Sequence, residues 1–233
     1  MWQIEQPTIF LPGTLCDERV WLPLWQNCNF AAGCRQYAPL QWANDLEQML
    51  SLTFDRLNSA PEPVHLVGFS MGGYVAALAA LQHRNIAKLT LVGYNPRGLD
   101  ATEEKQRLAI IKSINSGGFK NFSDERLLQF ITPQELEDTS AGDTIREMAA
   151  DLGGATLKAH FTATTPRQDL TQKLAKAHFP IHFIAAEHDK VAPLLAIKEC
   201  AKHISNAKVT AIHNTAHMML LTTPNDCGNA IFS

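Results

Sequence analysis

The chain alternates short apolar runs with longer stretches in which apolar residues recur at helical spacing. The short runs are rich in Val, Ile, Leu and Phe, a composition that favours β-strands. We expect six strands, at residues 8–12, 35–39, 64–69, 88–94, 181–186 and 208–213. Most of these runs do not alternate cleanly between apolar and polar residues, which is typical of strands covered on both faces. The pattern therefore predicts an α/β fold, with a mostly parallel twisted sheet flanked by crossover helices.

Three helices between these strands are expected from spacing and capping signals. Residues 45–57 carry apolar side chains at helical spacing, and Asn44 and Glu47 before them have the spacing of a capping box. Residues 71–83 are apolar almost all round, which predicts a helix packed between two layers. A third helix is expected at 193–203.

The alternation stops at residues 95–166, where the pattern predicts several short amphipathic helices and no strand. Capping residues and glycine pairs mark their starts and two of their ends, at Thr102, Ser123, Thr132, Asp143, Gly117-Gly118 and Gly153-Gly154. We interpret this segment as a helical cap inserted after the strand at 88–94. Residues 1–94 and 167–233 would then form the core.

Composition narrows the class of protein. A chain of 233 residues with 45% hydrophobic and 18% charged residues predicts one large domain or one domain with a modest insertion. The formal charge of −3 gives no reason to expect nucleic acid or an anionic membrane as a partner. Five scattered cysteines without a C-x-x-C pair, and no export signal or long apolar run, indicate a cytoplasmic protein.

Residues 68–72 read Gly-Phe-Ser-Met-Gly, the pattern G-x-S-x-G, between an expected strand and an expected helix. A serine at so tight a turn takes a strained backbone conformation, and side chains at 68 and 72 would collide with neighbouring elements, so glycine flanks it. The Ser70 hydroxyl would project from the carboxyl edge of the sheet, where α/β sheets bind ligands. A glycine-rich turn with an incidental serine is the alternative.

A serine hydroxyl becomes a competent nucleophile only when a base accepts its proton and a third group orients that base. For this turn the expected chain order is serine, acid, histidine. Asp189 follows the strand at 181–186, and His217 follows the strand at 208–213. The sequence thus predicts Ser70, Asp189 and His217 as catalytic residues.

Each partner has an alternative. Glu187 is a second carboxylate two residues before Asp189, and His213 lies four residues before His217. Asp189 would also serve as a helix cap before the helix at 193–203.

Two backbone N–H groups are candidates for an oxyanion hole. Met71 lies at the start of the helix after the serine, and Thr14 follows the early strand in a sharp Pro12-Gly13-Thr14 turn. A plain Pro-Gly turn is the alternative. No H-E-x-x-H motif and no glycine-rich dinucleotide or phosphate loop occurs, so we expect neither a metal nor a cofactor.

Over nearly its whole length the chain resembles the α/β-hydrolase superfamily. The resemblance rests on the opening LPGTLCDERVW, on GFSMG, and on the late segments AAEHDKVAP and NTAHMMLLTTP. It is greatest for the small capped carboxylesterase and lactonase group typified by pimeloyl-carrier-protein methyl ester esterase and 3-oxoadipate enol-lactonase. The chain departs from that pattern with proline, alanine or threonine where His, Gly or Glu is usual, at Pro12, Ala186, Ala216 and Thr222 or Thr223.

The resemblance implies a serine hydrolase that cleaves a small-molecule carboxylic ester, with a small to medium acyl group, through an acyl-enzyme. A lyase of the 2-succinyl-6-hydroxy-2,4-cyclohexadiene-1-carboxylate synthase type would use the same triad for proton abstraction and elimination. A non-catalytic ligand-binding protein with the hydrolase fold is the third possibility.

Apolar faces of the expected cap helices are candidates to line an acyl pocket, although such faces more often pack on the core. They comprise Leu108, Ile111, Ile114, Leu127, Leu128, Ile131, Ile145, Met148 and Leu152. Arg97 is a candidate to pair with a substrate carboxylate, and a solvated surface arginine is the alternative.

Overall fold

The computed structural model describes residues 1–232. Its main sheet has six parallel strands in the order β4-β2-β5-β6-β7-β8. In chain order they are β2 (Thr8–Leu11), β4 (Arg35–Tyr37), β5 (Val64–Phe69), β6 (Ile86–Val92), β7 (Ile181–Ala186) and β8 (Ala207–Ile212). All six predicted strands are confirmed, each within two residues at either end.

Two strands were not predicted. β1 (Trp2–Ile4) and β3 (Cys28–Phe30) pair in parallel as a separate two-stranded sheet. Each has three residues, too few for a hydrophobic period to be distinguished from a turn.

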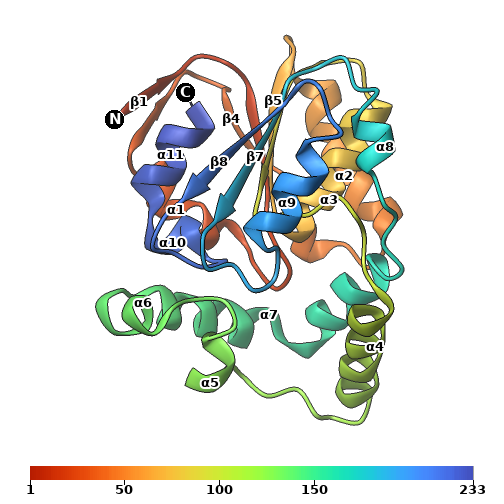
Figure 1. The fold of residues 1–233 in the computed structure, drawn as a ribbon, viewed down its shortest axis with the longest axis vertical. Helices are drawn as coiled ribbons and strands as arrows, with labels where there is room; N and C mark the ends of the chain where they lie inside the picture. The colour runs from red at the N-terminus through yellow and green to blue at the C-terminus, as the bar shows by residue number, and fades with distance from the viewer. Residues whose placement is uncertain (233) are drawn as a thin grey trace.

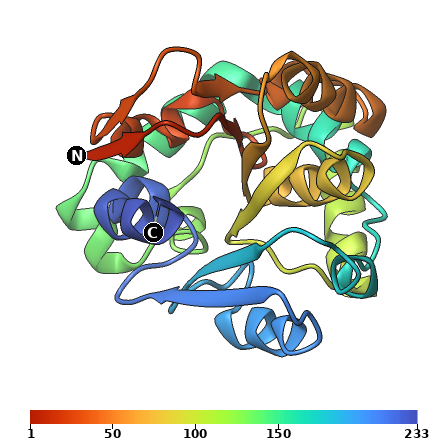
Figure 2. The same ribbon diagram turned by 90° about the horizontal axis from the view of Figure 1, so that it is seen from above.

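Helices cover both faces of the main sheet (Figures 1 and 2). One face carries α2 (Leu46–Ser59), α3 (Met71–Gln82), α8 (Thr171–Leu174) and α9 (Leu194–Ala201), and the other carries α1 (Leu22–Trp25), α10 (Met219–Thr222) and α11 (Pro224–Phe232). Two 3-10 turns, η1 (Glu18–Val20) and η2 (Leu40–Trp42), complete the core. Every residue of β5 and β7 is buried, which explains why these strands show little polar alternation.

The first turn of α2 corrects the predicted cap by one residue. The N-cap is Asp45, whose side chain accepts a hydrogen bond from the Gln48 N–H at 2.8 Å. The Gln48 side chain accepts in return from the Asn44 N–H at 2.9 Å. Gln48, three residues after Asp45, is correctly placed for this exchange, whereas Glu47 is not.

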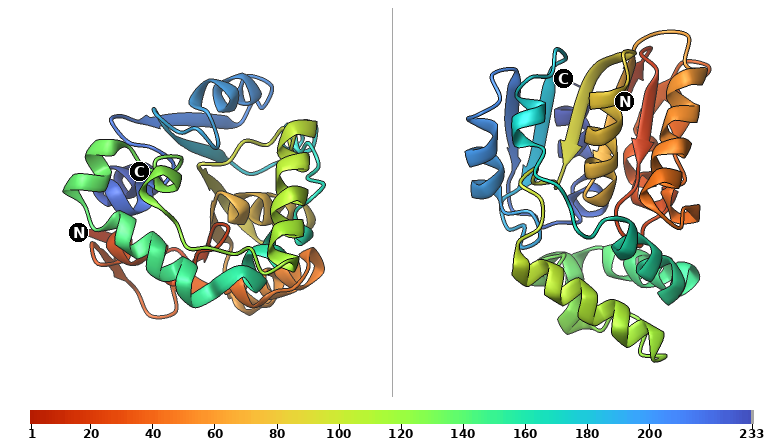
Figure 3. Two further views of the ribbon diagram at one scale, coloured as in Figure 1. Left: turned by 90° about the horizontal axis from the view of Figure 1, so that it is seen from below. Right: turned by 90° about the vertical axis from the view of Figure 1, so that its right-hand side faces the viewer.

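Four helices between β6 and β7 lie across the carboxyl edge of the sheet (Figures 1 and 3). We call them the cap: α4 (Ala101–Asn115), α5 (Asp124–Leu127), α6 (Pro133–Asp138) and α7 (Ala141–Ala163). Both chain ends lie at the opposite end of the molecule (Figure 1). The predicted domain boundaries at 95 and 166 stay a prediction, and Ser233 lies outside the described residues.

The predicted cap signals are confirmed in part. Ser123 and Thr132 are N-caps, whereas α4 begins after Asp100 and α7 after Ser140. The glycine pair at 153–154 marks the end of one helical segment, as predicted. Gly153 has a φ of 70° and a ψ of −178°, which is not helical, so α7 consists of two helical segments that meet at a kink there.

The cap packs on the core through a small apolar cluster that includes Leu15 from the loop after β2. Buried Ala149 and Leu157 of α7 contact it, with several half-buried cap residues around them. Among residues 1–232, no helix combines the length and apolar character that a bilayer crossing requires.

Candidate active site

Ser70 lies at the sharp turn between β5 and α3, with a φ of 50° and a ψ of −113°. A β-carbon at position 68 would lie 2.7 Å from the Gly73 Cα, and one at 72 would collide with the carbonyl oxygens of Leu11 and Pro12. Both flanking positions therefore require glycine. The strained turn expected from the G-x-S-x-G pattern is present, and it presents the Ser70 hydroxyl at the carboxyl edge of the sheet.

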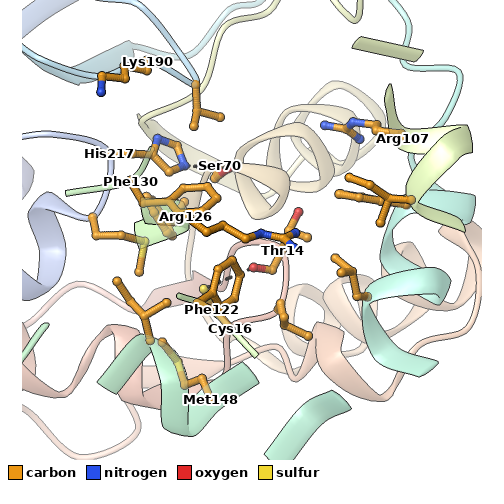
Figure 4. A pocket seen from close by; sticks show the side chains of 18 of the residues that line it. Thr14, Cys16, Ser70, Arg107, Phe122, Arg126, Phe130, Met148, Lys190 and His217 are labelled. Atoms are coloured by element: carbon orange, nitrogen blue, oxygen red, sulfur yellow. Dashed lines mark hydrogen bonds between the residues drawn. The ribbon is translucent and has the colours of Figure 1, made fainter. Parts of the chain in front are cut away.

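The structure brings the three predicted side chains together in one hydrogen-bonded chain. His217 Nε2 lies 3.1 Å from Ser70 Oγ, and His217 Nδ1 lies 2.8 Å from Asp189 Oδ2. The Asp189 side chain is fully buried, and its other oxygen accepts from the N–H groups of Val191 and Ala192, both at 2.8 Å. These bonds fix the carboxylate, which holds the imidazole with one nitrogen toward the serine (Figure 4).

The competing residues form a separate pair at the surface. His213 Nδ1 lies 3.3 Å from Glu187 Oε2, which also accepts from the Asn214 N–H at 3.1 Å. Both side chains are exposed. The geometry thus separates the exposed pair, Glu187 and His213, from the buried pair, Asp189 and His217.

The two predicted oxyanion donors are the N–H groups of Met71 and Thr14, and in the described part of the chain neither has the hydrogen-bond acceptor that a neighbouring N–H group has. Met71 is the first residue of α3, so its N–H has no acceptor inside the helix. No acceptor for the Thr14 N–H occurs within residues 1–232, whereas the adjacent Leu15 N–H donates to His160 Nδ1 at 3.0 Å. Of these two loop N–H groups, only that of Thr14 is thus free to donate to a ligand.

His160 is a cap residue that the sequence did not single out. It is fully buried in α7, and its Nε2 donates to the Leu40 carbonyl at 3.3 Å. Burial lowers its pKa to about 4, which keeps the ring neutral. A neutral ring can accept from the Leu15 N–H, and Leu15 itself has a φ of 54°, in the left-handed region.

A cavity of about 380 Å³ lies over Ser70, between the core and the cap. Thr14, Cys16, Ser70 and His217 line the core side (Figure 4). The cap side is mainly apolar and aromatic, with Ile110, Phe122, Phe130, Ile145, Met148, Leu157 and Phe161. The cap also contributes Arg107 and Arg126.

Sequence reasoning identified only part of this lining. Of the nine apolar cap residues considered, Ile145 and Met148 face the cavity. Arg97 does not line it. Cys16, Arg107 and Arg126 carry no spacing signal, because their position depends on how the loop and the cap helices sit on the core. Burial raises the pKa of the Cys16 thiol to about 12, so this cysteine is a lining group and not a nucleophile.

A family model described as the alpha/beta hydrolase family matches residues 1–227. The chain belongs to this family. Within residues 1–232, no group of three or more His, Cys, Asp or Glu side chains is arranged to hold a metal ion.

Solved structures with this fold cover nearly the whole α/β hydrolase. A thermophilic esterase from Thermogutta terrifontis has 20% identity and a TM-score of 0.79, with 99% of this chain and 89% of that one covered. MenH from S. aureus has 20% identity and a TM-score of 0.76, covering 98% and 92%. The enol-lactonase from Burkholderia xenovorans LB400 has 17% identity and a TM-score of 0.77, covering 97% and 90%. No curated protein sequence gave a significant match. At these identities the likeness establishes the fold.

Proposed function

We propose that this α/β hydrolase is a carboxylic-ester hydrolase that works through an acyl-enzyme. The observation that carries the proposal is the hydrogen-bonded chain from Ser70 through His217 to Asp189, at 3.1 and 2.8 Å. It lies at the floor of a mainly apolar cavity whose volume, about 380 Å³, is near the lower end for small-molecule sites. That volume favours a small to medium acyl group.

In the acylation step, Ser70 Oγ attacks the ester carbonyl carbon while His217 Nε2 accepts the hydroxyl proton. The carbonyl oxygen becomes an oxyanion, for which the free N–H groups of Thr14 and Met71 are the donors we propose. His217 then gives its proton to the leaving alkoxide as the carbon–oxygen bond breaks, and the alcohol departs.

In the second step, a water molecule attacks the acyl-enzyme while His217 accepts its proton. The carbonyl re-forms, the bond to Ser70 Oγ breaks, and the proton returns to the serine. Throughout, Asp189 accepts the Nδ1–H hydrogen bond and so stabilises the positive imidazole. Every residue needed comes from this chain, and the scheme requires neither a metal nor a cofactor.

We also propose that the protein is located in the cytoplasm. The five cysteines at 16, 28, 34, 200 and 227 are all free thiols, and four are buried. Free thiols fit a reducing compartment, which supports a cytoplasmic location.

The test uses p-nitrophenyl hexanoate and a fluorophosphonate probe on the wild type, Ser70→Ala and the matched control Ser51→Ala. Ser51 is exposed on α2. We expect Ser70→Ala to lower kcat by about 10⁵-fold or more and to abolish labelling, while Ser51→Ala keeps both. A protein that is labelled at Ser70 but turns over no ester, thioester or lactone would contradict ester hydrolysis.

A further inference from the structure

The cavity over Ser70 has more positive than negative side chains. Arg107, Arg126 and Lys190 line it, against one carboxylate, that of Glu103. The cap segment as a whole has the opposite sign of charge, because residues 95–166 contain 8 Lys and Arg but 11 Asp and Glu. Two of the three cations, Arg107 and Arg126, belong to this acidic segment.

Arg126 has no acidic partner within the described residues 1–232, although acidic residues lie beside it in the sequence. Asp124, two residues earlier, pairs instead with Arg146. Arg126 extends across the cavity, and its guanidinium carbon lies 4.8 Å from the centre of the Phe122 ring (Figure 4). Partial burial lowers its pKa, although the side chain as a whole stays exposed.

Arg107 reaches the cavity from the opposite wall (Figure 4). Its side chain is held in place, because Nη1 donates to Thr164 Oγ1 at 3.1 Å and the guanidinium stacks over the Phe161 ring at 5.0 Å. Burial lowers its pKa to about 10, and repulsion from Arg167 adds to this, while Glu103 opposes it only weakly. The structure thus fixes a second cation whose charge is incompletely balanced.

Lys190 differs from the two arginines. Its Nζ donates to the Leu128 carbonyl at 2.9 Å, so the ammonium is already bound to the cap backbone. Lys190 is therefore not part of the anion site that the two arginines form.

We propose that the substrate carries an anionic group, in the simplest case a carboxylate, that binds between Arg126 and Arg107. The inference rests on the proposed ester hydrolysis and adds the substrate class. A guanidinium presents parallel N–H donors that match a carboxylate, and an anion supplies the charge that the cavity lacks. The apolar lining suits the chain between this group and the ester.

The anionic group can belong to either part of the ester. A half-ester of a dicarboxylic acid carries it on the acyl side, whereas an ester of a hydroxy acid carries it on the alcohol side. Both place a carboxylate within the same cavity, and the test below distinguishes them.

The experiment measures kcat/KM for two matched pairs of esters. Mono-p-nitrophenyl adipate and p-nitrophenyl hexanoate differ by a carboxylate on the acyl side, and 4-carboxyphenyl hexanoate and 4-carbamoylphenyl hexanoate differ by one on the alcohol side. We expect the wild type to prefer the anionic member of one pair about tenfold or more. Because Arg126 is exposed at the mouth of the cavity, the preference should shrink as salt is raised.

Three variants of Arg126 and Arg107 and one control identify the source of the preference. Arg126→Met keeps the apolar stem and should reduce the preference about tenfold, Arg107→Met should also reduce it, and Arg126→Lys should retain part of it. The matched control is Arg84→Met, at an exposed arginine between α3 and β6, at the edge of the sheet opposite the cap. It should keep the full preference.

The inference is overturned if the wild type uses both members of each pair alike, or if neither Arg126→Met nor Arg107→Met alters the preference. Failure of ester hydrolysis itself is separable, because binding of monomethyl adipate and of methyl hexanoate to Ser70→Ala can be measured by calorimetry. These two esters differ by one carboxylate, so the site predicts tighter binding of monomethyl adipate, and loss of that difference in Ser70→Ala combined with Arg126→Met. Equal affinity for the two esters would refute it.

Discussion

The Glu135 carboxylate, in the cap, accepts a hydrogen bond from the Thr215 hydroxyl, two residues before His217 in the core. Glu135 is buried, and its other oxygen accepts from the Thr132 N–H at 2.7 Å as part of a capping box. Nearby, the Met218 N–H donates to the Phe130 carbonyl of the cap at 3.0 Å. The loop that carries His217 is therefore held from both sides of the histidine by cap residues.

Glu135→Ala should lower both stability and turnover. It leaves the Thr132 N–H without its acceptor and removes the buried carboxylate from the Thr215 hydroxyl, which keeps only Thr222 Oγ1 at 2.9 Å. We expect this to cost about 1–3 kcal/mol in the free energy of unfolding. Loosening of the His217 loop should lower kcat about tenfold. Urea denaturation and p-nitrophenyl ester kinetics measure the two effects. Glu137→Ala, at an exposed position of the same helix, is the control and should change neither; equal behaviour of the two variants would show that the contact does not matter.

His160→Phe should impair catalysis through the oxyanion loop. The ring volume is kept, but the Leu15 N–H loses its acceptor and the loop that carries Thr14 is no longer fixed. Because oxyanion donors act in the transition state, we expect kcat to fall by about 10- to 100-fold with little change in KM. His178→Phe, at an exposed position before β7, is the matched control. A change confined to KM would argue against this role.

Gly72→Ala should lower the free energy of unfolding far more than a substitution that only strains the backbone. A β-carbon at 72 collides with two backbone carbonyls, Leu11 and Pro12, which cannot move without disturbing β2. We expect a loss of at least about 3 kcal/mol. Gly33→Ala provides the comparison, because Gly33 has a φ of 77° but open space around it, and should cost about 1–2 kcal/mol. Denaturant midpoints measure both, and similar losses would remove the collision argument.

Acid should destabilise the fold at a pH above the range in which carboxylates titrate. Burial lowers the pKa of His65 and His182 to about 3 and that of His160 to about 4; Lys88 adds repulsion at the first two, and Lys208 adds it at His182. Below about pH 6.5 the unfolded chain gains protons that the folded chain does not, so stability is complete above pH 6.5 and falls as the pH drops toward 4.

The slope of the free energy of unfolding against pH tests whether the buried histidines cause this loss of stability. Each histidine contributes up to about 1.4 kcal/mol per pH unit, and unfolding free energies in urea between pH 7.5 and 5 measure the sum. His182→Asn should reduce this slope by up to one histidine's share. A stability that stays constant from pH 7.5 to 5 would contradict the prediction.

The sequence predicted the core better than the cap. The strands β5 and β7 are continuous apolar runs, so the order of elements and the turn at Ser70 could be located from local pattern alone. The chain order of serine, acid and histidine then indicated which residues the structure would bring together. Their catalytic roles stay a proposal until Ser70→Ala is assayed.

What the sequence could not predict depends on contacts between distant segments. Nothing near His160 or Glu135 indicates that their partners, Leu15 and Thr215, lie 145 and 80 residues away. The same holds for the cations of the cavity. Arg126 has acidic neighbours in sequence, and only the packing of the cap shows that it does not pair with them.

Different cap helices contact the loops of the core and supply the arginines of the cavity, which limits which helices can be exchanged without harm. Glu135 in α6 and His160 in α7 contact the loops that carry His217 and Thr14, whereas α4 and α5 carry Arg107 and Arg126. A chimaera that replaced the entire insert with that of a relative would exchange the cavity wall and remove both contacts at once. Grafting α4 and α5 alone would alter selectivity while leaving the reaction machinery supported, so diversification is expected to be tolerated in the first half of the insert.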